Sequence, residues 1–170
     1  MRRVLVIGSP GSGKSTWARR LADKLGLPLV HLDFYFWQAG WEPVQDDVFR
    51  NRVSELAAAP AWIMDGNYPR TFDIRMPRAD TLVWLEYPRT TCLLRVMGRV
   101  LRGYGRVRPD LAPGCPEQVD LAFFRYIWDF PAKHRPLIER GIERFGQHLR
   151  LVHLRGDRAC DDFLAAAEAG

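Results

Sequence analysis

The sequence predicts an α/β domain, with a parallel β-sheet covered by helices on both faces. Its 170 residues have room for one domain with a substantial core but are too few for two ordinary domains. Short and almost continuous apolar runs alternate with stretches of helical periodicity, which is typical of strands buried on both faces between helices. Polar residues directly follow several of these runs, at the carboxyl edge of the sheet where ligands bind.

The elements can be assigned in order along the chain. Five apolar runs predict the strands: 4–7, 29–32, 61–65, 81–86 and 149–154. Other stretches predict the helices: 16–25, 46–59, 88–101, 118–130, 135–145 and a last helix from about residue 158. Gly26 suits the end of the first helix, and Pro88 suits the first turn of the third. Residues 102–116 are rich in Gly, Pro and Arg and predict an irregular connection within a single domain, 1–170.

The composition excludes several protein classes. Hydrophobic residues make up 47% and charged residues 26% of the chain, and no apolar run approaches the roughly 20 residues of a membrane span. The amino terminus lacks the apolar core and cleavage site of a signal peptide, so we expect a cytoplasmic protein without membrane partners. Three widely spaced cysteines predict neither disulfides nor a zinc site. We expect a monomer or a weak dimer.

A glycine-rich segment after the first strand fits a phosphate-binding loop. Residues 8–15 match the pattern G-x-x-x-x-G-K-[ST], and the strand before them and helix after them argue against a coincidental turn. Glycines let backbone N–H groups turn toward one anion, and the helix N-terminus adds free donors. Lys14 would reach the β- and γ-phosphates, and the Ser15 hydroxyl would hold magnesium. The expected nucleotide contacts are Gly8, Gly11, Ser12, Gly13, Lys14, Ser15 and Thr16.

Two aspartates end the second and third apolar runs. Asp65, followed by Gly66, is the candidate for the carboxylate near the magnesium ion, acting through a metal-bound water; the alternative is an Asp-Gly turn. Asp33 could orient or deprotonate an acceptor hydroxyl, as a positioned carboxylate does in phosphoryl transfer; the alternative is a helix or turn cap. Because the carboxyl ends of parallel strands meet at one edge, we expect both side chains in one site with the phosphate loop.

Positive charge is carried almost wholly by arginine. Of 25 lysines and arginines only three are lysines, and the net charge is +5. No acid lies between Glu86 and Asp110, and this stretch contains Arg95, Arg99, Arg102, Arg106 and Arg108. Such a stretch could close over transferring phosphates as a lid, with Arg99 and Arg106 as catalytic residues. The alternatives are a solvated helix face and a nucleic-acid-binding patch.

Other candidates for substrate contacts are aromatic or basic. Trp37 and Trp41 lie in an aromatic segment that could form the wall of a pocket for a planar acceptor, although such residues belong to the core about as often. Arg70 follows the turn after Asp65 and could hold an acceptor anion. Arg155 follows the last strand, where a loop could contact the nucleotide base.

Several further segments of the sequence are similar to motifs of a known protein family. They are His31-Leu32-Asp33 with Trp37 and Gly40-Trp41, Trp62-Ile63-Met64-Asp65-Gly66-Asn67-Tyr68, Ala79-Asp80-Thr81, Pro88-Arg89-Thr90-Thr91-Cys92-Leu93, and Gly114-Cys115-Pro116-Glu117 before Tyr126-Ile127-Trp128. With these segments, the chain from Arg3 to about Arg155 resembles the nucleoside-monophosphate-kinase-like P-loop kinases. It most closely resembles the adenylate-kinase-related topology modulation proteins of the FlaR type.

The resemblance implies a three-layer P-loop NTPase fold. Its five parallel strands would lie in the order 2-3-1-4-5, with an acceptor-binding insert at about 34–60 and a helical lid at about 95–120. It also implies that Asp65 is linked to magnesium and that Arg70 contacts a phosphate, because their segment is similar to one in adenylate kinases. The arginines from 99 to 108 fall where such kinases place lid arginines. Asp33 is similar to the acceptor-contacting aspartate of shikimate-kinase-like enzymes, which phosphorylate a hydroxyl.

Taken together, these features predict an ATP- and Mg²⁺-dependent phosphotransferase. Its acceptor would be a nucleotide or a small molecule, and the sequence does not identify it. One alternative is a nucleotide-dependent regulator that associates with DNA, which the positive charge and the traditional name of the resembling proteins suggest. The other is a plain NTPase, whose hydrolysis would not depend on an acceptor.

Overall fold

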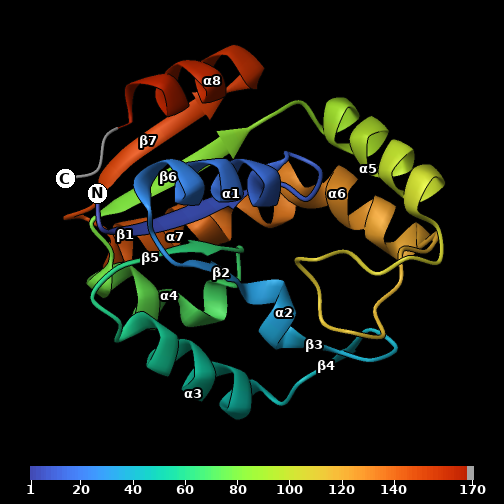
Figure 1. Cartoon of the computed structure of the whole chain (residues 1–170), viewed down its shortest axis with the longest axis horizontal. Helices are drawn as coiled ribbons and strands as arrows, with labels where there is room; N and C mark the ends of the chain where they lie inside the picture. Colours follow the sequence, from blue (N-terminus) through green and yellow to red (C-terminus); the bar gives the residue numbers. More distant parts are fainter. Residues whose placement is uncertain (168–170) are drawn as a thin grey trace.

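A five-stranded parallel sheet lies at the centre of the computed structural model, which describes residues 1–167 (Figure 1). The strands are β1 (Arg3–Gly8), β2 (Leu29–His31), β5 (Trp62–Asp65), β6 (Thr81–Glu86) and β7 (Arg150–Arg155). They lie in the order β2-β5-β1-β6-β7, which is 2-3-1-4-5 when these five strands alone are counted along the chain. The predicted fold class and strand order are confirmed.

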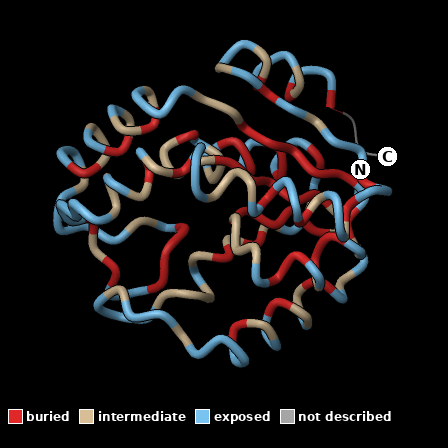
Figure 2. The backbone as a smooth tube through the Cα atoms, turned by 180° about the vertical axis from the view of Figure 1, so that it is seen from behind, coloured by how far each residue is buried: buried red, intermediate tan, exposed pale blue. Residues whose placement is uncertain are grey.

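Side chains of the central strand alternate between two parts of the core. In β1, Leu5 and Ile7 pack on one face of the sheet, and Val4 and Val6 pack on the other. All four are fully buried, because β1 lies between β5 and β6 and helices cover both faces (Figure 2). The loop that follows Gly8 therefore leaves the sheet at its middle.

The helices form the two outer layers. On the face of Val4 and Val6 lie α1 (Lys14–Leu25) and α8 (Gly156–Ala166). The other face is covered by α3 (Asp46–Ala57), α4 (Phe72–Arg75), α6 (Leu121–Lys133) and α7 (Arg135–Phe145). The remaining long helix, α5 (Arg89–Gly103), packs on α6 near the carboxyl edge of the sheet (Figure 1). This is the predicted three-layer arrangement.

The second strand is shorter than predicted. It ends at His31, and Asp33 lies in a short helix, α2 (Leu32–Phe36), instead of following a strand. Leu32 is fully buried, so the apolar run continues into the core although the backbone has already turned. Hydrophobicity alone therefore extends the strand one residue too far.

Other short elements show no periodicity in the sequence. The aromatic segment forms a hairpin of β3 (Trp37–Gln38) and β4 (Glu42–Pro43), which turns at Gly40 with φ of +80°. Two single turns of 3-10 helix, Pro69–Thr71 and Met76–Arg78, flank α4. Each of these elements spans too few residues for a period of 2 or 3.6 to be visible.

The helices near the carboxyl terminus are close to their predicted bounds. α6 begins after Asp120, whose side chain accepts hydrogen bonds from the N–H groups of Ala122 and Phe123, so the helix starts three residues later than predicted. Within the described residues, none of the helices has the length and apolar character needed to cross a membrane.

Candidate functional site

The phosphate-binding loop has a backbone that favours glycine. Gly11 and Gly13 have φ angles of +82° and +85°, in the left-handed region. A Cβ atom at Gly11 would also lie 2.4 Å from the carbonyl oxygen of Cys92 in the first turn of α5. α1 begins at Lys14, and no side chain in the described part of the structure caps its amino end. Its first N–H groups are therefore available to an anion.

We expect Gly11→Ala to lower the free energy of unfolding by about 2 to 3 kcal/mol, because it forces a left-handed alanine against the Cys92 carbonyl oxygen. Gly26→Ala is the matched control, since Gly26 has a φ of +65° but its added Cβ would meet no atom within 4 Å. Urea unfolding of both variants measures the difference. Equal losses would contradict a role for the contact with α5.

Two side chains hold this loop from outside. The Asn67 amide donates to the Gly8 carbonyl oxygen at 2.9 Å and accepts from the Gly8 N–H at 3.1 Å. Arg95 donates to the Ser12 carbonyl oxygen at 3.2 Å and pairs with Asp157 at 2.7 Å. Arg95 therefore braces the loop from α5, a role that the arginine spacing did not suggest. Asn67 could have been noticed only through its place in the motif after Asp65.

The ends of β2 and β5 bring a histidine beside Asp65. His31 and Asp65 are opposite each other in the parallel register, and His31 Nδ1 lies 3.0 Å from Asp65 Oδ2. The preceding residues, Val30 and Met64, both pack in the core on the face opposite α1. Because side chains alternate along a strand, His31 and Asp65 both point toward the face that α1 covers.

Asp65 is 4% exposed, and its carboxylate faces the first turn of α1. Burial alone would raise its pKa, but the positive charge of Lys14, with the nearby His31 imidazole and Ser15 hydroxyl, outweighs burial and holds the pKa below its ordinary value. Asp65 Oδ1 is buried without a hydrogen-bond partner in the described structure. A carboxylate oxygen beside a serine hydroxyl fits the oxygen ligands of Mg²⁺. Residues 1–167 contain no cluster of three or more His, Cys, Asp or Glu that could hold a metal, so the ion would also need phosphate oxygens.

The turn after β5 is built around a buried arginine that the sequence did not reveal. Arg75 is fully buried, and its Nε donates to Thr71 Oγ1 at 2.9 Å. Its other nitrogens donate to three carbonyl oxygens: Gly66 at 3.2 Å, Asn67 at 2.6 Å and Tyr68 at 3.3 Å. Burial lowers the pKa of Arg75 to about 9, which leaves the guanidinium charged at neutral pH.

Asp33 is bound by a tyrosine from the same turn. The Tyr68 hydroxyl donates to Asp33 Oδ1 at 2.6 Å. Burial, with the charge of Asp33, raises the pKa of Tyr68 far above its ordinary value. The same two causes raise the pKa of Tyr126, on α6, to about 12. Asp33 therefore lies near two phenols that are protonated at neutral pH, at the same edge of the sheet as the phosphate loop.

Arg70 and Trp37, which were predicted to bind the acceptor, contact other residues of the protein in this structure. The Arg70 side chain is 70% exposed and pairs with Asp46 at 3.1 Å. Trp37 packs against Phe36 and Trp41, with ring centroids 4.8 and 5.7 Å apart. A role for Arg70 or Trp37 in substrate binding stays a prediction.

The segment between α5 and α6 folds onto the β3–β4 hairpin. The Gly40 N–H donates to the Gly114 carbonyl oxygen at 2.8 Å, and the Trp41 indole N–H donates to that of Pro116 at 3.0 Å. Leu111, Ala112 and Cys115 of this segment pack together with Trp37 and Trp41. Two parts of the chain that were predicted separately, the aromatic segment and the lid, are therefore in direct contact (Figure 1).

Two arginines of the predicted lid neutralise buried acids. Glu117 is buried and pairs with Arg99 at 2.9 Å and with Arg108 at 2.6 Å. Asp110, also buried, pairs with Arg108 at 2.9 Å. Burial, with the charge of Arg108, lowers the pKa of Arg99. Contact between Arg99 and a phosphate would require the pair with Glu117 to open.

Arg106, a predicted catalytic residue, and Arg155, a predicted contact of the nucleotide base, lie at the surface. Arg106 is exposed in the segment after α5. Arg155 pairs with Glu86 at 2.8 Å, and Glu86 also binds Arg135. The predicted phosphate contact of Arg106 and base contact of Arg155 stay predictions.

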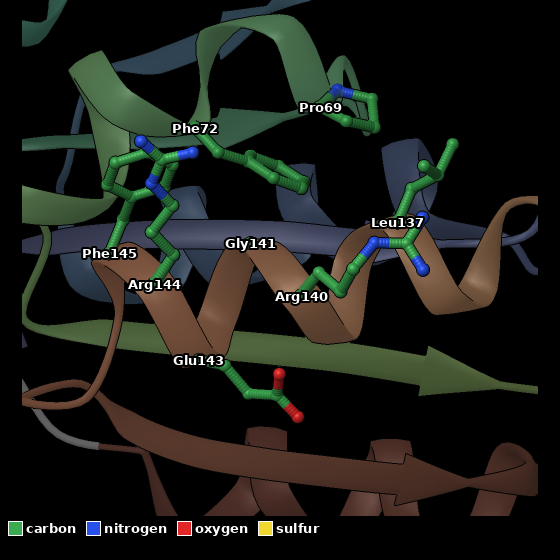
Figure 3. A pocket seen from close by; sticks show the side chains of 8 residues that line it. All are labelled: Pro69, Phe72, Leu137, Arg140, Gly141, Glu143, Arg144 and Phe145. Atoms are coloured by element: carbon green, nitrogen blue, oxygen red, sulfur yellow. The ribbon is translucent and has the colours of Figure 1, made fainter.

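A shallow hollow of about 490 Å³ lies between α7 and the turn around α4 (Figure 3). Its lining residues are Pro69, Phe72, Leu137, Arg140, Gly141, Glu143, Arg144 and Phe145. Phe72 covers Gly141 so closely that a Cβ there would lie 2.4 Å from its ring. None of the residues predicted for the site lines this hollow, so we expect the nucleotide at the phosphate loop instead.

Several known proteins are similar to this chain in sequence. A family described as an AAA domain matches residues 4–66, from β1 through the phosphate loop to the end of β5. The adenylate kinase of Clavibacter michiganensis subsp. michiganensis is 28% identical over 109 residues, which cover 62% of this chain and 53% of that enzyme. The adenylate kinase of Agrobacterium fabrum is 29% identical over 168 residues, which cover 79% of this chain and 82% of that enzyme. The chain thus spans about half the length of the first of these relatives.

Solved structures share the fold. Shikimate kinase from Acinetobacter baumannii, in complex with shikimate, has a TM-score of 0.61 at 16% identity, with 98% of this chain and 90% of that chain covered. A gluconokinase from Sinorhizobium meliloti has a TM-score of 0.53 at 16% identity, with 97% and 92% covered. At this identity the likeness concerns the fold alone. In both sequence and fold, the chain is similar to P-loop kinases.

Proposed function

We propose that the chain is an ATP- and Mg²⁺-dependent phosphotransferase. The observation that carries this proposal is the buried Asp65 carboxylate, whose Oδ1 has no hydrogen-bond partner in the described residues and which faces Lys14 and Ser15. Such oxygen atoms suit magnesium bound to nucleotide phosphates. The AAA-domain match and the adenylate kinase relatives support the same class of protein.

The chemistry of each group on the donor side suggests its role. Lys14 and the N–H groups of the loop would bind the phosphates and neutralise charge that develops during transfer. Ser15 would hold the magnesium ion directly and Asp65 through water, and bound magnesium supplies further positive charge at the phosphates. Arg106 in the lid segment, and Arg99 once released from Glu117, would close over the transferring group.

The acceptor is proposed to be a hydroxyl compound bound near Asp33. Tyr68 holds Asp33 Oδ1, which leaves the second carboxylate oxygen to accept a hydrogen bond from the acceptor. Trp37 and Arg70 would lie on the acceptor side, although Arg70 pairs with Asp46 in this structure. A phosphate-bearing acceptor would have to compete with that pair.

Among P-loop kinases, the motifs around Asp33 and Asp65 favour topology modulation proteins of the FlaR type as relatives. A DNA-associated role has less support than phosphoryl transfer. Nucleic acid binding needs arginines that are open to phosphates, but Arg95, Arg99 and Arg108 are each paired with an acid.

ADP release from ATP and Mg²⁺ tests the proposal, with a panel of nucleoside monophosphates and small hydroxy compounds as acceptors. We expect a hydroxy compound to raise ADP release above the rate with ATP alone. If every acceptor leaves hydrolysis unchanged, a plain NTPase explains the site better.

With a working acceptor, Asp33→Asn should lower kcat about a hundredfold, because the amide cannot take the proton of the acceptor hydroxyl. Its Kd for ATP should change less than about twofold, since Asp33 does not touch the donor side. Asp23→Asn is the control, because Asp23 is exposed on α1. An Asp33→Asn variant with wild-type kcat would contradict the role of this carboxylate.

A further inference from the structure

We propose that His31 is a positioning residue for Asp65. The hydrogen bond from His31 Nδ1 to Asp65 Oδ2 leaves the other oxygen, Oδ1, free for the proposed magnesium ion, in a carboxylate that lies beside Lys14 and Ser15. The inference rests on the proposed role of Asp65 as the carboxylate near the magnesium ion. It assigns a function to the residue that ends β2.

The backbone fixes the distance between the two side chains. His31 is the last residue of β2 and Asp65 the last of β5, and the parallel pairing puts them directly opposite each other. Their side chains are 13% and 5% exposed, so water has little access to the bond between them. The pairing of the two strands therefore fixes the 3.0 Å distance between His31 Nδ1 and Asp65 Oδ2, and no loop conformation is involved.

Asp65 needs such a partner because its carboxylate turns easily. The last torsion of an aspartate is a broad sp³–sp² rotation with no sharp minimum. His31 binds Oδ2, and Oδ1 has no hydrogen-bond partner within the part of the chain that the structure describes. Fixing one oxygen of a planar carboxylate fixes the other, so His31 determines where Oδ1 points.

The chemistry of the contact identifies which nitrogen carries the proton. An ionised carboxylate only accepts, so Nδ1 must be the protonated nitrogen of His31. Residues that orient the groups around a metal ion typically contribute tenfold to a hundredfold in metal affinity or activity. The bond also satisfies one oxygen of a charge that would otherwise be buried without a donor.

Two substitutions separate the hydrogen bond from simple packing. His31→Asn can place an amide N–H where Nδ1 lies, because both nitrogens are attached to Cγ. His31→Leu fills similar space without a donor. The test is the Kd for ADP, measured by calorimetry once in EDTA and once with saturating Mg²⁺. The Kd in EDTA divided by the Kd with Mg²⁺ gives the factor by which the metal tightens binding.

We expect His31→Leu to lower this ratio about tenfold and His31→Asn to keep it within about twofold of the wild type. The metal-free Kd should stay within about twofold for both variants, since neither touches the phosphate-binding amides. Asp65→Asn should lower the ratio at least as much as His31→Leu. In the Asp65→Asn background, His31→Leu should cause no further loss, because His31 acts through Asp65.

Three results would overturn the inference: a wild-type ratio in His31→Leu, an equal loss of metal-free affinity, or losses that add in the double variant. Failure of the proposed function looks different. In that case Mg²⁺ would not tighten ADP binding to the wild type and Lys14→Ala would not weaken it, and the role of His31 would fall with that of Asp65. If Mg²⁺ and Lys14 both matter and His31→Leu behaves as wild type, only the inference about His31 fails.

Discussion

Lys14→Ala should lower kcat about a thousandfold and weaken ATP binding. Lys14 is the first residue of α1, and its charge acts directly on the buried Asp65 carboxylate. Without the ammonium group, charge that develops on the transferring phosphoryl group loses one of the cations that would neutralise it, in a site where such interactions are worth several kcal/mol. ADP release with a working acceptor measures kcat, and calorimetry measures the Kd for ATP.

Lys133→Ala is the control for loss of one positive charge. Lys133 is at the end of α6, exposed, and pairs with Asp129 on the same helix. We expect it to leave both kcat and the Kd for ATP within about twofold of the wild type, because surface ion pairs contribute little. Full ATP turnover in Lys14→Ala would contradict the proposed mechanism.

Arg75→Met should lower the free energy of unfolding by about 3 to 5 kcal/mol, the largest stability effect we expect for a single side chain in this protein. The substitution removes the donor of two carbonyl oxygens of the turn after β5, those of Gly66 and Asn67. The Tyr68 carbonyl oxygen loses one donor but still accepts from Thr71. The substitution also removes the cost of burying the guanidinium charge, so the net loss is smaller than the sum of the broken bonds.

The Arg75→Met substitution should also weaken the hydrogen bond between Tyr68 and Asp33. Tyr68, one of the carbonyl partners of Arg75, has a φ of +35°, which a non-glycine residue adopts only when its surroundings hold it there. Once this turn relaxes, we expect Tyr68 to release Asp33. Urea unfolding gives the stability, and kcat with a working acceptor gives the second effect.

Arg78→Met is the matched control, because Arg78 is partly buried in the neighbouring turn and donates to one carbonyl oxygen, that of Ile74, at 3.1 Å. Its expected cost is about 1 kcal/mol. If both variants lose the same free energy of unfolding, the hydrogen bonds of Arg75 stabilise the protein no more than the single hydrogen bond of Arg78.

Much of the fold could be predicted because it depends on runs of residues. The central strand needs only four consecutive buried side chains, 4–7, and the glycine pattern after it fixes the start of α1. The alternation of strands and helices then requires that Asp65 and the phosphate loop meet at one edge of the sheet. Each of these features is local in sequence, so composition and spacing reveal it.

The network behind the site could not be predicted in the same way. His31 binds a residue 34 positions away, and Asn67 binds Gly8 across 59 positions. Such contacts depend on strand register, which leaves no mark in a single sequence. Arg75 was missed for another reason: a single arginine is usually a surface residue, and only the folded turn shows the three carbonyl oxygens around it.

Because Gly11 lies against Cys92, α5 contacts the phosphate-binding loop at one end and leads into the predicted lid segment at the other. The amino-terminal end of this helix rests on the phosphate-binding loop, within 2.4 Å of where a side chain would begin, and its carboxyl-terminal end leads into the segment that covers the aromatic hairpin. Fifteen helical residues extend about 22 Å, so a small tilt at the pivot becomes a larger displacement at the tip. The phosphate-binding loop and the segment that covers the aromatic hairpin are thus connected through one continuous helix.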